Sequence, residues 1–442
     1  MKTIDKIPTG KLERTTTLVK TGVKLGGNYL SYYGKKAIGS DVSRETLDEA
    51  NAADIYDGLK DLKGSALKVA QMLSMEKSIM PRAYVEQFSL AQFSVPPLSA
   101  PLVRKTFKRY TGNYPEEVFD TFSKEAVNAA SIGQVHRATL NGKQIAVKIQ
   151  YPGVADAISS DLAMVKPIAT RLFNIKAKDA QKYFMEVEGK LLEETDYDLE
   201  IKRSQFITKA CEAIPGLVFP KYYPEYSNSR ILVMDWIEGK HLSEFTKEST
   251  NQEINNGIGQ SLWDFYMYQM HVLKQVHADP HPGNFIVTKV EKLAAIDFGC
   301  IKEIPNSFYI PYFQLSQKST FEDASNLKSR MLQLELLKET DSQEEETYFM
   351  NLFKEMLSLF SEPFQHESFD FGNPDFWNRI TALSEKFSKD KDLRKMDANR
   401  GSEHFLYINR TFFRLYNLLN DLKAKVEIDR LKVFKNSVNS VV

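Results

Sequence analysis

Three polar side chains in the second half of the chain have the types and the spacing needed for phosphate chemistry. Asp279 is followed five residues later by Asn284, and thirteen residues after that by Asp297, which begins the tripeptide Asp-Phe-Gly. A carboxylate can orient or deprotonate an attacking oxygen, and an amide oxygen with a second carboxylate suits Mg²⁺. The apolar run between Asn284 and Asp297 predicts a strand pair that places these groups opposite one another. Residues 277–299 are therefore the predicted catalytic and metal-binding segment.

This order of groups is that of a kinase catalytic loop followed by its magnesium-binding hairpin. An isolated Asp-Phe-Gly occurs by chance and usually marks a turn, but the full set at this spacing favours the functional interpretation. A kinase also needs a lysine that holds the nucleotide phosphates. The sequence offers Lys148 on the second strand of a predicted hairpin, whose turn is Asn141-Gly142.

The loop before this hairpin is rich in small residues, which allow backbone amides to approach phosphate oxygens closely. Alanines stand at positions 129 and 130, where a kinase would carry glycines, and they predict a stiffer lid. A buried strand predicted over 229–239 would form the hinge that binds the adenine through its backbone. The predicted nucleotide contacts are Ala129, Ala130, Ser131, Gly133, Val135, Lys148, Met234 and Trp236.

The segment 191–200 contains five acidic residues within a predicted helix. One of them could pair with Lys148 and align it toward the phosphates. The competing interpretation is a solvated acidic turn, which would account for most of the five acidic residues but not for all of them. Further upstream, Lys68 and Gln71 lie three residues apart in another predicted helix, so their side chains share one face. Physical reasoning alone favours a solvated charged face for Lys68 and Gln71.

Residues 1–36 carry eight basic residues and only two acids. Apolar side chains are interleaved with these cations, as in an amphipathic helix that lies on an anionic membrane surface. The alternative is a helix that docks its apolar side on the body of the protein. Gly22, Gly26 and Gly27 weaken any single long helix here. The amphipathic segments 348–360 and 405–422 near the other end are rich in aromatic residues, which we expect in a core rather than in a lipid groove.

Composition limits the class of protein. The 442 residues exceed what one core comfortably serves, so two lobes are expected. Lysine and arginine together number 58, as do aspartate and glutamate, so bulk charge predicts no nucleic-acid partner. Two cysteines are too few for a disulfide framework or a zinc site. The first ten residues have no apolar signal core, and no long apolar run predicts a membrane span, so a cytoplasmic location is expected.

With these residues in view, the chain resembles the UbiB-type atypical kinase-like family, also known by its AarF domain. The resemblance runs from about residue 45 to 300 and rests on specific motifs. These are the KxGQ helix at Lys68-Val69-Ala70-Gln71, the alanine-rich loop at Asn128-Ala129-Ala130-Ser131, the lysine strand at 146–154, the ExD motif at Glu194-Thr195-Asp196, and the catalytic loop with its metal hairpin. Position 70 is alanine where the family has glycine.

The resemblance implies roles that spacing alone does not give. In this family the KxGQ helix folds over the active site, where its lysine and glutamine reach the phosphate region and block protein substrates. Lys68 and Gln71 would therefore be site residues. The ExD glutamate is the partner of the strand lysine, which makes Glu194 the expected partner of Lys148. Asp196 would tie this region to the KxGQ helix.

The resulting prediction is an α+β, bilobal protein-kinase-like fold with an N-terminal helical extension that carries the KxGQ-like motif. The expected divisions are a basic segment over 1–42, the helical extension over 43–125, the N-lobe over 126–238 and the C-lobe with further helices over 239–442. ATP or ADP would bind with Mg²⁺ between the lobes, with Asn284 and Asp297 as metal ligands, Lys148 on the phosphates and Asp279 as the catalytic residue that positions the attacking oxygen.

The expected activity is slow ATP hydrolysis or phosphoryl transfer to a small or lipid-like acceptor, in support of isoprenoid quinone biosynthesis or membrane lipid homeostasis. Anionic lipid or an isoprenoid-quinone precursor is the expected partner, through peripheral membrane contact. Two alternatives remain. One is a nucleotide-sensing scaffold without significant turnover. The other is a small-molecule kinase of the aminoglycoside type, against which the Lys68 helix and the Ala129-Ala130 loop argue.

Overall fold

The computed structural model describes residues 11–38, 40, 43–62, 66, 68–69, 82–89, 97–129, 132–172, 177–389 and 400–433. The chain divides into two compact units. The first unit comprises Met1–Ser204 and Lys221–Trp236, and the second comprises Gln205–Pro220 and Ile237–Val442. The division after Trp236 lies two residues from the lobe boundary expected from the sequence. The segment Gln205–Pro220, which we expected in the N-lobe, belongs to the second unit.

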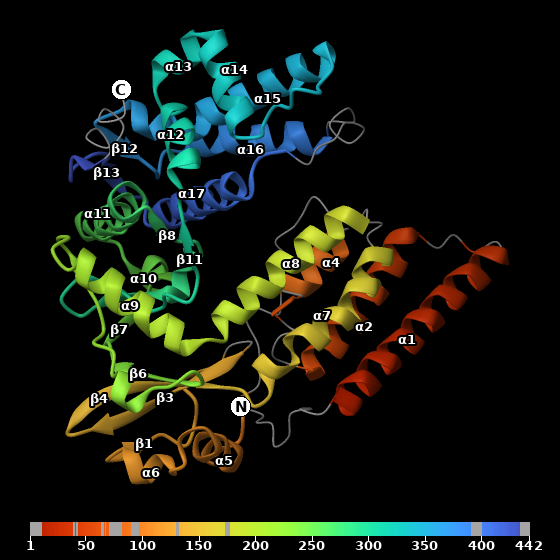
Figure 1. Ribbon diagram of the computed structural model, residues 1–442, viewed down its shortest axis with the longest axis vertical. Coiled ribbons are helices and arrows are strands. Elements are labelled where there is room, and N and C mark those ends of the chain that lie inside the picture. The colour runs from red at the N-terminus through yellow and green to blue at the C-terminus, as the bar shows by residue number, and fades with distance from the viewer. Residues whose placement is uncertain are drawn as a thin grey trace. The chain divides into compact units, whose positions relative to one another are not determined.

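The first unit contains a five-stranded antiparallel sheet (Figure 1). Its strands follow the order β1, β3, β4, β6, and β2 pairs with β3 outside that path. Alternating burial along β3 and the continuous apolar run of β6 are typical of strands that pack one or both faces against a core. The strands are β1 Thr121–Phe122, β2 Asn128–Ala129, β3 Gly133–Leu140, β4 Lys143–Gln150 and β6 Ile231–Asp235.

The predicted hairpin is confirmed. Leu140 pairs with Lys143 across the turn, and both Asn141 (φ 49°) and Gly142 (φ 76°) have the positive φ that a type I′ turn requires. This turn fixes the register that places Val135 directly opposite Lys148. The sheet is thus built so that the predicted phosphate lysine has one defined neighbour on each side.

The first unit also contains helices (Figure 1). The acidic segment 191–200, expected within one helix, is divided between two helices, because the Asp196 side chain accepts the backbone N–H groups of Asp198 (3.1 Å) and Leu199 (3.2 Å) and so starts a new helix. The helices of the first unit are α1 Lys11–Ala37, α2 Arg44–Leu62, α4 Arg82–Ser89, α5 Ala100–Thr111, α6 Pro115–Val118, α7 Val154–Leu172, α8 Ala177–Glu194 and α9 Tyr197–Cys211, of which α9 ends in the second unit.

The described part of the basic N-terminal segment forms one long helix, α1, over Lys11–Ala37, despite its glycines. It docks on α2 and touches α7 (Figure 1). Leu25 and Tyr32 are buried there, and the approach is close: a Cβ atom at Gly58 of α2 would lie 2.1 Å from the Thr21 hydroxyl. The alternative prediction, a helix whose apolar side docks on the body of the protein, therefore holds for one face of α1. Its other face exposes large apolar side chains, namely Val19, Val23, Leu30 and Tyr33.

A buried ion pair fastens α1 to α7. The Arg14 Nε donates to Asp161 Oδ1 (2.8 Å), its Nη2 pairs with Oδ2, and its Nη1 donates to the Leu62 carbonyl (3.0 Å). Arg14 is 3% exposed and Asp161 is fully buried. Removing one partner of such a pair leaves an uncompensated buried charge, which costs about 3–5 kcal/mol.

We therefore expect Arg14→Gln to lower the thermal unfolding midpoint and to open α1 to proteolysis, as measured by a melting curve and by limited digestion. Lys24→Gln is the matched control on the same helix, because Lys24 forms only a long, exposed pair with Asp54 (3.4 Å). Exposed pairs contribute about 0–1 kcal/mol. Equal midpoints for the two variants would contradict a fastening role for Arg14.

In the described part of the second unit there are three sheets and a set of helices. Its four-stranded sheet has the order β5, β10, β9, β7, and two-stranded sheets pair β11 with β8 and β12 with β13. The strands are β5 Leu217–Val218, β7 Gly239–His241, β8 Gln275–His277, β9 Phe285–Thr288, β10 Leu293–Ala295, β11 Ile301–Glu303, β12 Ser368–Asp370 and β13 Lys425–Glu427. The predicted strand pair between Asn284 and Asp297 is β9 and β10, antiparallel.

The helices of the second unit include the two expected aromatic ones, α15 Gln343–Phe360 and α17 Glu403–Asp421. The helix before the catalytic loop, α11 Gln252–Tyr268, passes into a π-turn, η3 Gln269–Leu273, and then into β8. The remaining helices are α10 Leu242–Glu248, η4 Pro282–Asn284, α12 Asn306–Gln314, α13 Lys318–Glu322, α14 Ala324–Gln333, η5 Glu362–Gln365 and α16 Pro374–Lys389.

This mixture of helices and sheets confirms the predicted α+β class. Among the residues that the structure describes, no helix has the length and apolarity needed to cross a membrane.

Candidate functional site

Lys148 of β4 is held by a carboxylate from α9, within the first unit. Its Nζ donates to both oxygens of Glu200 at 3.0 Å. Glu200 is only 2% exposed, so this is a desolvated, charge-assisted pair rather than a surface contact. The ammonium also lies 4.8 Å from the centre of the Tyr197 ring, in the range of a cation–π interaction. Lys148 is thereby fixed in one orientation.

The predicted pairing of Glu194 with Lys148 is wrong. Glu194 ends α8 and forms an ion pair with Lys68 (2.7 Å), whereas the partner of Lys148 comes six residues later. The physical reason is the helix break at Thr195 and Asp196, because the new helix α9 turns Glu200 toward β4. The prediction that an acid within 191–200 pairs with Lys148 is confirmed, but that acid is Glu200 and not Glu194.

Lys68 lies on the partly exposed side of a short helical stretch whose neighbours Ala66 and Val69 are fully buried. The contact with Glu194 ties this stretch to the end of α8, a role that we had expected Asp196 to fill. Asp196 instead caps α9. Gln71, the other predicted residue of this helix, lies outside the described residues.

The predicted phosphate loop is described only in part. Ala129 pairs with Gln134 in the short ladder of β2 and β3, while Ala130 and Ser131 lie outside the described residues. Gly133 has a packing reason to be glycine, because a Cβ atom there would lie 2.7 Å from the Ile149 carbonyl oxygen.

Met234 and Trp236, the predicted hinge residues, lie at the end of β6. Met234 is buried and pairs with Ala146 of β4. The backbone N–H of Trp236 donates to the Gln144 carbonyl (3.1 Å), and the Arg137 guanidinium lies 4.9 Å from the centre of the Trp236 ring. The first unit ends at Trp236, as expected for a connection between two lobes.

Within the second unit, hydrogen bonds between main-chain groups hold the catalytic loop against the metal hairpin. His277 pairs with Ile301 across β8 and β11, and the Ala278 N–H donates to the Cys300 carbonyl (2.9 Å). The Ile296 N–H donates to the Asn284 carbonyl (3.1 Å). The segment that carries Asp279 is therefore fastened on both sides of Asp297, as the spacing in the sequence predicts.

The two predicted metal ligands have suitable donor atoms. The Asn284 amide nitrogen donates to the Asp279 carbonyl (3.1 Å), so its oxygen is the atom that remains for a cation. One oxygen of Asp297 accepts the Gly299 N–H (2.9 Å), which fixes the carboxylate. An oxygen-only donor set suits Mg²⁺, which takes few protein ligands and completes its shell with phosphate and water. No cluster of three or more His, Cys, Asp or Glu side chains occurs among the described residues, so a metal held entirely by such a cluster is not supported there.

A buried network supports the loop from beneath. The Gln269 side chain accepts the His277 N–H (2.9 Å), and the Tyr266 hydroxyl lies 3.1 Å from His277 Nδ1. Burial lowers the pKa of His277, although Asp279 and Asp297 act in the opposite direction, and burial raises the pKa of Tyr266. The imidazole is therefore neutral and serves as a fixed support for the main chain before Asp279.

Asp279 itself forms an ion pair with Arg414 of α17, in which Nη1 donates to Oδ1. Reasoning from the sequence missed Arg414, Tyr266 and Gln269. No spacing rule connects Arg414 with a residue 135 positions earlier. Tyr266 of α11 and Gln269 of η3 lie in an apolar segment whose composition is typical of a core, and only their nearness to the catalytic loop in sequence could have drawn attention to them.

His271, in the π-turn before β8, makes this region sensitive to acid. Its Nδ1 lies 2.7 Å from the Tyr309 hydroxyl, and burial together with nearby Lys274 lowers its pKa to about 3. The ordinary value is about 6.5. Because only the unfolded chain takes up the proton between these values, this contribution to stability is complete above about pH 6.5 and is lost as the pH falls toward about 3, at up to about 1.4 kcal/mol per pH unit.

We therefore expect His271→Gln, which keeps a polar partner for Tyr309 but cannot be protonated, to flatten the loss of stability with acid. Urea unfolding at about pH 7 and about pH 5 measures this, since about pH 7 lies above the window in which only the unfolded chain takes up the proton and about pH 5 lies within it. An unchanged loss of stability in the variant would contradict the assignment to His271.

Comparison with known proteins identifies the family of this chain. The model of the ABC1 atypical kinase-like domain matches residues 90–331. The chain is 27% identical to the probable serine/threonine-protein kinase abkA of Dictyostelium discoideum and 28% identical to the mitochondrial atypical kinase COQ8 of Saccharomyces cerevisiae, over 81% and 76% of this chain and 67% of each relative. It is 31% identical to a chloroplastic aarF domain-containing protein kinase of Arabidopsis thaliana, over 64% of this chain but only 40% of that protein.

Among solved structures, the Rv3197 protein of Mycobacterium tuberculosis, determined as a complex with erythromycin, has a similar fold. Its TM-score is 0.60 at 26% identity, and the match covers 89% of this chain and 97% of that one. The names of the yeast and Arabidopsis relatives place those two proteins in mitochondria and chloroplasts, compartments that the expected cytoplasmic location did not include.

Proposed function

Because this chain belongs to the ABC1 atypical kinase-like family, as its motifs predicted, we propose that it binds ATP with Mg²⁺ and turns it over slowly. The observation that carries the proposal is the buried pair of Lys148 with Glu200. A strand lysine held by a helix glutamate is the arrangement that kinases need to place the nucleotide phosphates.

The chain's own groups take the following roles in this proposal. Lys148 binds the phosphates and Glu200 keeps it aligned, while Asn284 and Asp297 hold the metal. Bound Mg²⁺ would neutralise charge on the phosphates. Asp279 orients the attacking oxygen, which belongs either to water or to an acceptor hydroxyl.

We further propose that the acceptor is not a protein. The resemblance implies that the KxGQ helix restricts access to the phosphate region, and the contact of Lys68 with Glu194 supports this by holding that stretch against the end of α8. Water, or a small or lipid-like molecule such as an isoprenoid-quinone precursor, is then the acceptor. Support of quinone biosynthesis or lipid homeostasis rests on the same resemblance.

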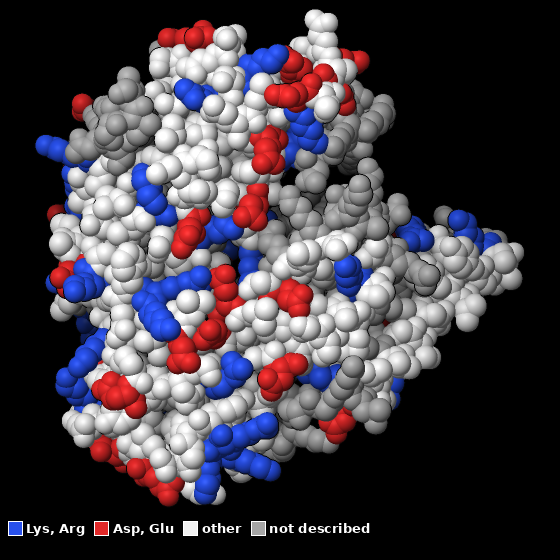
Figure 2. All heavy atoms as spheres, in the orientation of Figure 1, with Lys and Arg blue, Asp and Glu red and all other residues white. Residues whose placement is uncertain are grey.

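The exposed face of α1 supports a peripheral contact with anionic lipid. Val19, Val23, Leu30 and Tyr33 are exposed on a helix that also carries exposed lysines. In Figure 2, the described surface where α1 lies is largely uncharged and carries a few basic side chains. Apolar side chains flanked by cations bind the interface of an anionic membrane.

Phosphate release from Mg-ATP, measured with and without liposomes that contain anionic lipid, tests the proposal. We expect slow release that lipid accelerates. The rival is a nucleotide-sensing scaffold, which the Lys68 to Glu194 bridge also supports because it restricts access without catalysis. Saturable nucleotide binding without steady release in either condition would favour the scaffold over the enzyme.

A further inference from the structure

The catalytic aspartate is held by a residue from the far end of the chain. Arg414 and Asp279 form an ion pair within the second unit, and their side chains are 26% and 40% exposed. A partly exposed pair contributes only about 0–1 kcal/mol to stability. The main effect of this pair is therefore to set the position of the Asp279 carboxylate, rather than to stabilise the fold.

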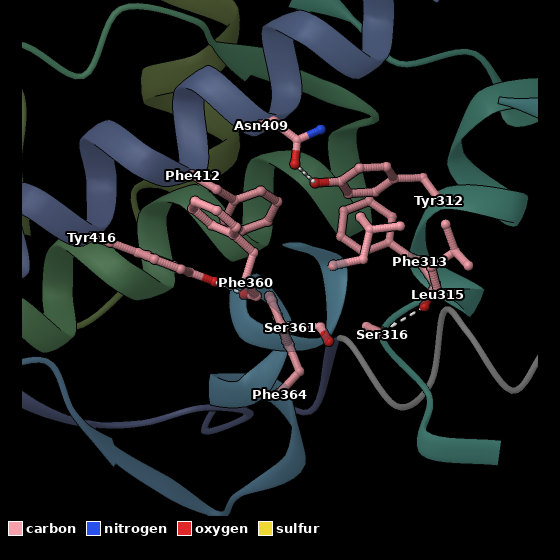
Figure 3. Close-up of a pocket in the computed structure, with 11 residues that line it drawn as sticks. Tyr312, Phe313, Leu315, Ser316, Phe360, Ser361, Phe364, Asn409, Phe412 and Tyr416 are labelled. Carbon is pink, nitrogen blue, oxygen red and sulfur yellow. Dashed lines mark hydrogen bonds between the residues drawn. The ribbon is translucent and has the colours of Figure 1, made fainter. Parts of the chain in front are cut away.

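The helix that carries Arg414 is anchored on another face. Figure 3 shows Asn409, Phe412 and Tyr416 of α17 pointing into a small pocket in an aromatic cluster. The Tyr416 hydroxyl donates to the Phe360 carbonyl (2.9 Å), and the Tyr312 hydroxyl donates to the Asn409 side chain (3.2 Å). The cavity in this cluster is about 30 Å³, which is far too small for a lipid chain. The cluster is packing that fixes α17, as expected of its aromatic residues.

The main chain around Asp279 is fixed independently. Gln269 and Tyr266 support His277, and Asn284 binds the Asp279 carbonyl. These contacts hold the backbone but leave the carboxylate two rotatable bonds of its own. A guanidinium with a planar set of donors, presented by a rigid helix, restricts that rotation.

We propose that Arg414 is a positioning residue, through which α17 orients the Asp279 carboxylate toward the attacking oxygen. The inference rests on the proposed function and adds that α17 must hold the Asp279 carboxylate in place for turnover. Arg414 touches Asp279 and is not assigned a contact with nucleotide. Its loss should therefore slow the chemical step and leave nucleotide binding nearly unchanged.

Steady-state phosphate release from Mg-ATP by the full-length chain tests this. Arg414→Gln should lower kcat about 10–100-fold, the cost of a misplaced catalytic group, with the KM for ATP changed less than about threefold. Arg414→Lys, which keeps the charge but lacks the planar fork, should fall between wild type and Arg414→Gln. Arg379→Gln is the matched control, because Arg379 of α16 makes a two-bond pair with Glu362 of η5 (2.6 and 2.7 Å) outside the site, and it should keep the wild-type kcat.

A double-mutant cycle distinguishes positioning from a general structural role. If Arg414 acts through Asp279, Arg414→Gln should add little to the loss already caused by Asp279→Asn. Additive losses in the cycle, or a kcat of Arg414→Gln within about twofold of wild type, would overturn the proposal. If Arg414→Gln does not fold, as judged by its unfolding midpoint, a folded Arg414→Lys with the wild-type kcat overturns it.

Failure of the proposed function would give different results from failure of the role of Arg414. Wild type without phosphate release would remove the enzymatic function and the role of Arg414 together. Release that Asp297→Asn abolishes but Arg414→Gln leaves intact would remove only the role of Arg414.

Discussion

Asp297→Asn is expected to reduce magnesium-dependent ATP turnover by at least about a hundredfold, because the metal contributes several kcal/mol of charge stabilisation. Asparagine has the same shape as aspartate, and its oxygen can still accept the Gly299 N–H that fixes residue 297. The variant therefore loses the negative charge that holds Mg²⁺ while it keeps the local fold. Phosphate release at saturating Mg-ATP measures the effect.

Two controls accompany this variant. Its thermal unfolding midpoint should equal that of wild type, since the hairpin of β9 and β10 does not depend on the charge. Excess Mg²⁺ should restore part of the turnover if the defect lies in metal affinity. Turnover at the wild-type level in Asp297→Asn would remove the metal assignment and, with it, the catalytic role of the 277–299 segment.

Glu200→Gln is expected to reduce turnover about 10–100-fold, because Lys148 loses the carboxylate that aligns it with the phosphates. Glu200 is buried, so the substitution also leaves the Lys148 ammonium without its charged partner and lowers stability. The KM for ATP should rise together with the fall in kcat, because Lys148 contacts the phosphates in the ground state and contacts them more strongly in the transition state.

Glu194→Gln is the matched comparison, with the same chemical change six residues earlier. Its pair with Lys68 is partly exposed and contributes about 0–1 kcal/mol, so turnover should change far less than in Glu200→Gln. A larger loss of turnover in Glu194→Gln than in Glu200→Gln would mean that Glu194 aligns Lys148 during turnover. The pairing predicted from the ExD motif would then be correct.

Local signals in the sequence predicted much of the fold. Asn141-Gly142 requires positive φ at both positions and so specified the hairpin that carries Lys148. The spacing of Asp279, Asn284 and Asp297 likewise specified a loop and a strand pair, because few arrangements satisfy those distances along the chain. These features depend on residues close in sequence, where backbone geometry leaves little freedom.

The parts that could not be predicted depend on contacts between distant residues. Glu200, rather than Glu194, pairs with Lys148 because the helix breaks at Asp196. The Asp196 side chain accepts backbone N–H groups and starts a new helix, which carries Glu200 in a different direction. Arg414 reaches Asp279 only because the aromatic cluster around Tyr416 fixes α17. Neither contact leaves a pattern at helical or strand spacing.

Titration of ATP into the wild-type protein, once with Mg²⁺ and once with excess chelator, tests most directly whether these residues form a nucleotide site. We expect saturable binding of one nucleotide per chain in the presence of Mg²⁺ and clearly weaker binding in the chelator, because Asn284 and Asp297 act on the nucleotide through the metal. The absence of saturable binding in both conditions would contradict the account.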